Sequence, residues 1–99
     1  MTEHRKHPRA PISIPVIFEV EGGPRVEAWC ADLSLGGMFI ETGHPASYGA
    51  PLRIYARLPG CNAIIDAVVR WSKPTGMGVQ FGPMGARETH GLTELLAQR

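Results

Sequence analysis

The sequence predicts an all-β fold, a small six-stranded antiparallel β-barrel followed by one C-terminal α-helix. Apolar residues recur at every second position in several short stretches, which is the period of a half-buried strand. Clusters of glycine and proline separate these stretches at close spacing, which is typical of the turns of a small barrel. A chain of 99 residues suffices for one core, so we expect one domain over residues 1–99.

The first two strands are expected to form a hairpin. Apolar residues alternate along 12–20, and Glu21-Gly22-Gly23-Pro24 then supplies a turn. The alternation continues along 25–33. It predicts one face carrying Val26, Ala28 and Cys30 and an opposite face carrying Trp29, Ala31 and Leu33.

Four further strands complete the barrel that we expect over 12–82. Gly36-Gly37 turns the chain into a strand at 38–42, and residues 43–51 have the composition of a loop. Alternation then predicts strands at 52–58, 63–71 and 77–81, which are separated by Gly/Pro turns. On the longest of these, the inward face is expected to carry Ile65, Ala67, Val69 and Trp71.

The period changes at the C-terminal end, where residues 85–98 are predicted to form a helix. Leu92, Leu95 and Leu96 share one helical face, which we expect to cover an open end or edge of the barrel. Trp29 and Tyr55 lie opposite the main apolar stripes of their strands. We expect them to pack under this helix, and the alternative is that they belong to a partner surface.

Composition and charge argue against several classes of protein. The net charge is +1, which does not favour a general polyanion-binding protein. No apolar run approaches the ~20 residues of a membrane span, and no secretory signal is visible, so we expect a cytoplasmic protein. Cys30 and Cys61 lack metal-ligand spacing, and we expect reduced thiols, with a disulfide as the alternative. No metal site and no cofactor are predicted.

Residues 1–11 are expected to form a flexible, arginine-rich arm. Residues 4–9 hold Arg5, Lys6 and Arg9 together with two histidines and no acid. A guanidinium is a planar fork that pairs with phosphate oxygens and with the O6 and N7 acceptors of guanine. Two arginines four residues apart could therefore bind one anionic ligand together. The alternative is a terminal segment that only aids solubility.

A polar turn follows the second predicted strand. Asp32 can accept hydrogen bonds from N1–H and N2–H₂ of guanine, and Ser34 can bond phosphate or cap the turn. Gly36 and Gly37 allow positive φ angles and bare backbone N–H groups, which suit an anion. The alternative is a tight turn in which Asp32 and Ser34 satisfy their own backbone.

With these two motifs, the chain resembles the PilZ domain, a bacterial receptor module for cyclic di-GMP. The family's R-x-x-x-R arm and [D/N]-x-S-x-x-G turn correspond to Arg5-Lys6-His7-Pro8-Arg9 and to Asp32-Leu33-Ser34-Leu35-Gly36-Gly37. Val69-Arg70-Trp71 and the segment 76–81 also resemble the last two strands of the family, so the match covers about residues 4–97.

The resemblance implies binding rather than turnover. Arg5 and Arg9 would clasp guanine and phosphate, while the turn residues Asp32, Ser34, Gly36 and Gly37 would hold the ligand on the barrel. Many members have a further arginine where this chain has His4, a position that influences whether one nucleotide or a stacked pair is bound. We expect the bound nucleotide to order the arm and so to signal to a downstream partner protein.

Three other functions remain as alternatives. A degenerate PilZ-type adaptor would bind a protein and no nucleotide, and loss of either motif would favour it, but both are intact. A nucleic-acid-binding barrel would need a basic and aromatic strand face, for which Arg53, Tyr55 and Arg57 are the only such trio. An enzyme is the third, but no arrangement of nucleophile and base or of paired carboxylates is visible, so no catalytic residue is predicted.

Overall fold

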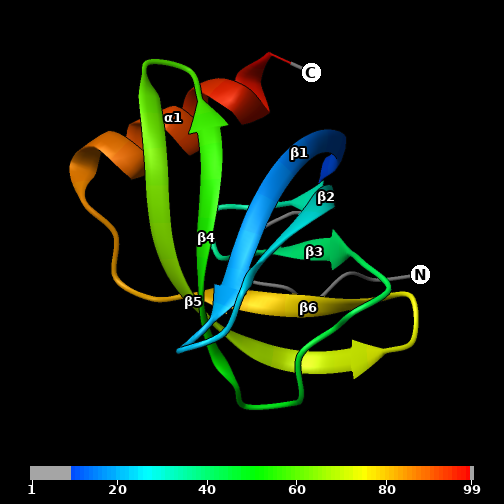
Figure 1. Ribbon diagram of the computed structural model, residues 1–99. Coiled ribbons are helices and arrows are strands. Elements are labelled where there is room, and N and C mark those ends of the chain that lie inside the picture. The colour runs from blue at the N-terminus through cyan, green and yellow to red at the C-terminus, as the bar shows by residue number, and fades with distance from the viewer. Residues whose placement is uncertain (1–9, 99) are drawn as a thin grey trace.

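The computed structural model describes residues 10–98, which form a closed barrel of six antiparallel strands and one C-terminal helix (Figure 1). This confirms the predicted fold class, and the ends of the predicted strands and helix differ from those observed by no more than two residues. The elements are β1 (Ala10–Val20), β2 (Arg25–Leu33), β3 (Gly37–Glu41), β4 (Pro51–Leu58), β5 (Cys61–Lys73), β6 (Gly76–Phe81) and α1 (Ala86–Ala97).

The strands follow each other around the barrel in the order β1-β2-β3-β6-β5-β4, and β4 closes it by pairing with β1. Closure pairs every strand on both sides and leaves no open edge. The inward side chains form one core, in which the largest fully buried residues include Phe18, Ile40, Ile54 and Met77. Most of this core follows the predicted alternation.

Helix α1 lies across one end of the barrel against β4 and β5 (Figure 1). Leu92 is fully buried there, and Leu95 and Leu96 pack against the core, as the helical face predicted. Gly91 is buried against the end of β4, where a Cβ would lie only 2.9 Å from Cβ of Leu58. A glycine in mid-helix therefore lets the helix approach the barrel closely.

A register shift in β2 changes which side chains face the core. Cys30 pairs with Ile40 of β3, but Asp32 and Leu33 pair with Phe39 and Met38, so β2 carries one extra residue. Leu33 is consequently buried together with Cys30, and Asp32 lies on the outer face. The prediction that Leu33 lies on the face opposite Cys30 was therefore wrong.

A second register shift occurs in β5. Val69 pairs with Val79 of β6, whereas Trp71 pairs with Gly78, so the alternation is broken between them. Val69 is fully buried, and Trp71 remains 40% exposed on the outer face. The prediction of an inward Trp71 was wrong because strict alternation cannot anticipate the extra residue.

The prediction that Trp29 and Tyr55 pack under the helix was also wrong. Trp29 lies on β2, away from the strands that α1 covers, and it is 50% exposed. Tyr55 lies on the outer face of β4, and its hydroxyl donates to a carboxylate oxygen of Glu19 at 2.5 Å. Cys30 and Cys61 form no disulfide in the structure; Cys30 is buried, and its Sγ lies 3.4 Å from the carbonyl oxygen of Asp32.

Candidate functional site

One row of residues crosses the outer face of four neighbouring strands. Asp32 on β2 pairs with Phe39 on β3, Phe39 pairs with Gly78 on β6, and Gly78 pairs with Trp71 on β5. Residues that are directly opposed in antiparallel strands present their side chains on the same face. The row therefore contains, in order, a carboxylate, a phenyl ring, a glycine without a side chain and an indole.

The two rings of this row stack on each other. The centroids of Phe39 and Trp71 are 5.2 Å apart and their planes differ by 12°. Lys73 extends from the end of β5, with its Nζ 5.4 Å from the Phe39 centroid and 5.6 Å from the Trp71 centroid. These are cation–π distances, so the site combines a flat aromatic surface with a positive charge.

Two glycines of β6 make room for the rings. A Cβ on Gly78 would collide with the indole of Trp71, and a Cβ on Gly76 would collide with the Phe39 ring and the carbonyl oxygen of Ile40. Since neither glycine has a positive φ, the requirement is space rather than backbone conformation. The outer surface of β6 is flat here, and the rings lie directly on its backbone.

The turn between β2 and β3 is held together by Ser34, which is only 5% exposed. Its Oγ accepts hydrogen bonds from the N–H groups of Gly36 and Gly37 at 3.1 and 3.2 Å and donates to the carbonyl oxygen of Gly37 at 3.4 Å. The backbone N–H of Ser34 also donates to that carbonyl, at 2.9 Å. This geometry corresponds to the alternative in which the serine side chain makes its hydrogen bonds to the backbone of its own turn.

The expected conformation of the two glycines was wrong. Within residues 10–98, positive φ angles occur at Gly22, Gly49 and Gly60, but not at Gly36 or Gly37. The N–H groups of the pair are bonded to Ser34 rather than bare. A Cβ on Gly37 would collide with the carbonyl oxygen of Val79, so this glycine allows β3 and β6 to approach closely.

The structure brings Asp32, Ser34, Gly36 and Gly37 together at the end of β2 and the start of β3. Arg5, Arg9 and His4, with the rest of the predicted arm up to residue 9, lie outside the described residues. The described chain nevertheless begins beside the turn, because Ala10 pairs with Leu33 and Pro11 pairs with Asp32.

Sequence reasoning missed four residues of this site, namely Phe39, Trp71, Lys73 and Gly78. A weak signal was present, because Gly76 and Gly78 alternate with buried Met77 and Val79 and so leave the outer face of β6 without side chains up to Gln80. The position of Trp71 depends on a bulge, and the stack with Phe39 depends on the pairing of β3 with β6, which are not consecutive strands.

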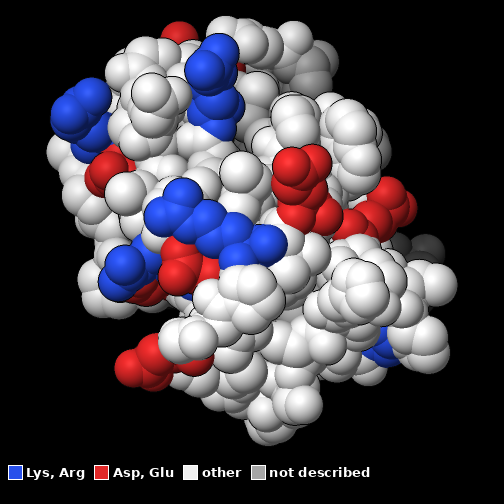
Figure 2. Space-filling view, in the orientation of Figure 1, with Lys and Arg blue, Asp and Glu red and all other residues white. Residues whose placement is uncertain are grey.

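Charged side chains of both signs are interspersed on the face of the molecule seen in Figure 2, and neither sign is gathered into a large patch there. Among residues 10–98, no group of three or more His, Cys, Asp or Glu side chains could hold a metal ion. No helix in the same range is long and apolar enough to cross a membrane. The row itself combines a carboxylate, two stacked rings and a nearby ammonium group, which suit a compact ligand with planar and hydrogen-bonding groups.

Comparisons with known proteins agree with this architecture. The model of the PilZ domain family matches residues 3–98. The PilZ domain of CeSA from a cellulose-synthesizing bacterium is similar in structure, with a TM-score of 0.72 and 24% sequence identity, over 88% of this chain and 92% of that chain. No curated protein matches the chain in sequence.

Two longer proteins have a similar structure. The Bacillus subtilis inhibitor of motility, MotI/DgrA, has a TM-score of 0.76 and 21% identity over 99% of this chain and 52% of that one. The Borreliella burgdorferi PlzA protein, in complex with c-di-GMP, has a TM-score of 0.74 and 16% identity over 92% of this chain and 40% of that one. These likenesses show a shared fold. PilZ is a family of cyclic di-GMP receptor and adaptor domains that are in general not enzymes, and the match over nearly all residues shows that this chain belongs to it.

Proposed function

We propose that this chain is a cyclic di-GMP receptor that binds the nucleotide across the row of Asp32, Phe39, Gly78 and Trp71. The observation that carries the proposal is the pair of bulges. Strict alternation would bury both Asp32 and Trp71, but a bulge in β2 and a bulge in β5 turn them outward, one on each side of Phe39. Bulges that re-aim side chains are enriched next to binding sites.

The groups of this row match the chemistry of the ligand. Guanine is planar and carries N1–H and N2–H₂ donors, which the Asp32 carboxylate can accept. The aromatic pair supplies a surface on which a base can stack, and Trp71 keeps 40% of its surface exposed. The ammonium group of Lys73 adds a positive charge beside both rings, where a phosphate of the ligand can pair with it.

The N-terminal arm completes the proposed site. Ala10 and Pro11 pair with Leu33 and Asp32, so Arg9 is covalently bonded to a residue that lies beside the site. Consecutive Cα atoms are about 3.8 Å apart, which also keeps Arg5 within reach of the row. The guanidinium groups of Arg5 and Arg9 would pair with phosphate oxygens and with the O6 and N7 edge of guanine. His4 would lie next to these two arginines.

Ser34, Gly36 and Gly37 act in this proposal by shaping the site. Since the Ser34 hydroxyl is buried and engaged with the turn, its role is to fix the loop that presents Asp32. Bound nucleotide would hold the arm against the barrel and so create a new surface, through which we propose that the chain signals to a downstream protein. Ordering the arm costs about 1–2 kcal/mol of free energy per residue. Charge-assisted hydrogen bonds to the nucleotide, at about 1.5–3 kcal/mol each, offset this cost.

The fold of PlzA, which is bound to c-di-GMP, is consistent with this function, and calorimetric titration of the 99-residue chain with cyclic di-GMP tests it. We expect saturable binding that Arg9→Ala, Asp32→Ala and Trp71→Ala each abolish or weaken at least about tenfold. For Arg9 and Asp32 the cause is the loss of charge-assisted hydrogen bonds, and for Trp71 it is the loss of base stacking. Arg87→Ala is the matched control, because Arg87 lies exposed on α1 and should leave affinity unchanged. Circular dichroism would show that each variant is folded.

Fluorescence gives a second and more local measurement. The described chain holds Trp29 and Trp71, and the variant Trp29→Phe leaves Trp71 as the reporter of the site. We expect cyclic di-GMP to change the emission of Trp71 in this variant. Absence of any binding to the wild-type chain would contradict the receptor proposal and favour the degenerate adaptor, whose ligand is a protein.

A further inference from the structure

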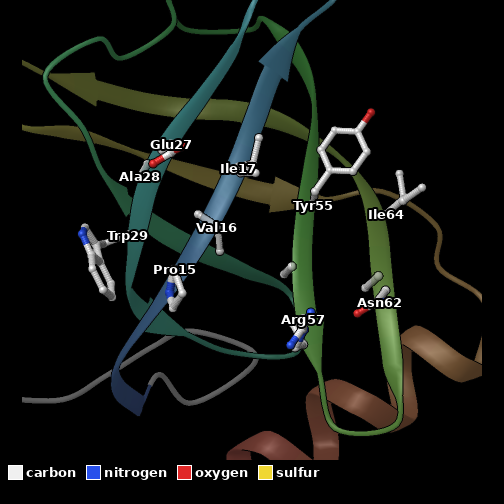
Figure 3. Close-up of a pocket in the computed structure, with 12 residues that line it drawn as sticks. Pro15, Val16, Ile17, Glu27, Ala28, Trp29, Tyr55, Arg57, Asn62 and Ile64 are labelled. Carbon is white, nitrogen blue, oxygen red and sulfur yellow. The ribbon is translucent and has the colours of Figure 1, made fainter.

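A second surface lies on a different face of the barrel, over β2, β1, β4 and β5 (Figure 3). It is a shallow groove of about 690 Å³, and its floor is the strand backbone at Val16, Ala28, Ala56 and Ala63, whose small side chains point into the core. Apolar side chains stand around it, and two of them are strongly exposed, Trp29 at 50% and Ile64 at 56%. Exposed apolar patches of this kind mark interaction sites in soluble domains.

The groove is framed by two parallel rows of residues. In one row, Glu27 pairs with Ile17, Ile17 with Tyr55, and Tyr55 with Ile64. In the second row, Trp29 pairs with Pro15, and Arg57 pairs with Asn62. The two charged residues of the groove are Glu27 on β2 and Arg57 on β4. Together with Trp29 and Tyr55 they form the four corners of a rectangle that has β1 across its middle. Glu27 and Arg57 are at diagonally opposite corners of it, as Figure 3 shows.

We infer that this face binds a second copy of the same chain. A symmetric dimer brings identical patches together, so its surface must be complementary to itself. A two-fold axis that lies in the face along the diagonal from Trp29 to Tyr55 would bring each Glu27 close to Arg57 of the second copy. The same axis would set Trp29 against Trp29 and Tyr55 against Tyr55, and the opposite charges would form two equivalent ion pairs.

The neighbouring residues favour a preformed surface. The ring of Tyr55 is held by the hydrogen bond of its hydroxyl to Glu19 and by the guanidinium of Arg25, whose Cζ lies 4.4 Å from the ring centroid. Beside it, Arg53 Nε and Asp66 Oδ1 form an ion pair of 3.4 Å, which continues a polar rim along one side of the groove. An apolar centre with a polar rim is the usual anatomy of a protein interface.

The apolar part of the surface is small, and its area sets the affinity that we expect for the dimer. The surface spans four strands that are about 4.8 Å apart and two rows that are about 7 Å apart. This area is less than the roughly 800 Å² per partner of a standard interface. We therefore expect a reversible dimer with a Kd in the micromolar range. The dimer does not require cyclic di-GMP, because this face is distinct from the row that carries Asp32 and Trp71.

Sedimentation equilibrium of the 99-residue chain over a series of concentrations up to about 1 mM tests the inference. The wild-type chain should change from monomer to dimer within this series. Ile64→Asp should abolish the dimer and leave circular dichroism unchanged, because Ile64 is mostly exposed. Glu27→Arg and Arg57→Glu should each weaken association at least about tenfold through like-charge contacts. Glu94→Arg, on exposed helix surface, is the matched control and should have no effect.

The decisive measurement mixes the two charge-reversal variants. If Glu27 faces Arg57 of the other copy, a mixture of Glu27→Arg and Arg57→Glu restores opposite charges at both contacts and should associate as the wild-type chain does. A chain that stays monomeric over the whole series would overturn the inference. So would a dimer that neither reversal weakens, or a mixture that fails to recover. Calorimetry with cyclic di-GMP is independent of these results, so failure here is distinguishable from failure of the receptor proposal.

Discussion

The indole of Trp71 lies directly against the backbone of Gly78, in the space that any larger residue would need for its Cβ. Phe39 stacks on the same indole at a centroid distance of 5.2 Å. The absence of a side chain on β6 thus determines where two aromatic rings lie on its neighbouring strands.

Gly78→Ala should displace Trp71 and break its stack with Phe39. Forcing a methyl group into an occupied space typically costs about 1–3 kcal/mol, so we expect a loss of that order in the free energy of unfolding, measured by urea denaturation. Near-ultraviolet circular dichroism should change with the ring packing. The control is Gly43→Ala, where a Cβ meets nothing within 4 Å. Equal stability of the two variants would contradict the assigned role of Gly78.

Ser34→Ala should destabilise the barrel and weaken cyclic di-GMP binding together. The substitution leaves the N–H groups of Gly36 and Gly37 without the acceptor that they now share. Unsatisfied buried groups cost about 1–3 kcal/mol, which urea denaturation measures directly. Ser47→Ala, at an exposed loop position, should change neither quantity. Full stability with lost affinity would instead indicate that Ser34 contacts the nucleotide itself.

Tyr55→Phe should raise the pKa of Glu19. The Tyr55 hydroxyl donates to the Glu19 carboxylate, and this hydrogen bond, aided by the positive charge of Arg25, holds the pKa of Glu19 below its ordinary value of 4.5. The variant should therefore titrate closer to 4.5 when the Glu19 carboxyl carbon is followed by NMR.

The sign of the pH effect on stability follows from that shift. Because the folded-state pKa of Glu19 is lowered, its stabilising contribution is present above pH 4.5 and is lost as the pH falls through the folded value. The difference in unfolding free energy between the wild-type chain and Tyr55→Phe should therefore be larger at pH 7 than at pH 3. Tyr48→Phe, whose ring is 71% exposed, is the control. An unchanged Glu19 titration would refute the prediction.

Gly91→Ala should fail to stabilise the protein, although alanine favours a helix over glycine by about 1 kcal/mol. A Cβ at this position would lie 2.9 Å from Cβ and 3.2 Å from Cδ1 of Leu58, so the helix would have to move away from β4. Thermal denaturation should show a melting temperature no higher than that of the wild-type chain. Thr89→Ala, at an exposed position of the same helix, should raise stability by a few tenths of a kcal/mol. A comparable rise for Gly91→Ala would contradict the packing argument.

Most of the fold could be predicted from local patterns, and the errors have one physical cause. Alternation located five of the six strands, the Gly36-Gly37 turn located β3, and the helical period of Leu92, Leu95 and Leu96 located the helix. The faces of Leu33 and Trp71 were mispredicted because each follows a bulge, and a single extra residue inverts every later assignment on a strand. Trp29 and Tyr55 were mispredicted because α1 covers a different part of the barrel.

The sequence by itself determined the class of fold, the approximate elements and the turn that holds Asp32 and Ser34, because periodicity and turn chemistry depend on neighbours along the chain. Only the tertiary structure decided that Asp32 shares a row with Phe39, Gly78 and Trp71, because that row joins the consecutive strands β2 and β3 to β5 and β6, which are far from them in sequence. It likewise decided that Gly37 and Gly78 are required for close approach rather than for positive φ. Such requirements arise between strands, where the space available to a side chain is set by the backbone or ring of a distant residue.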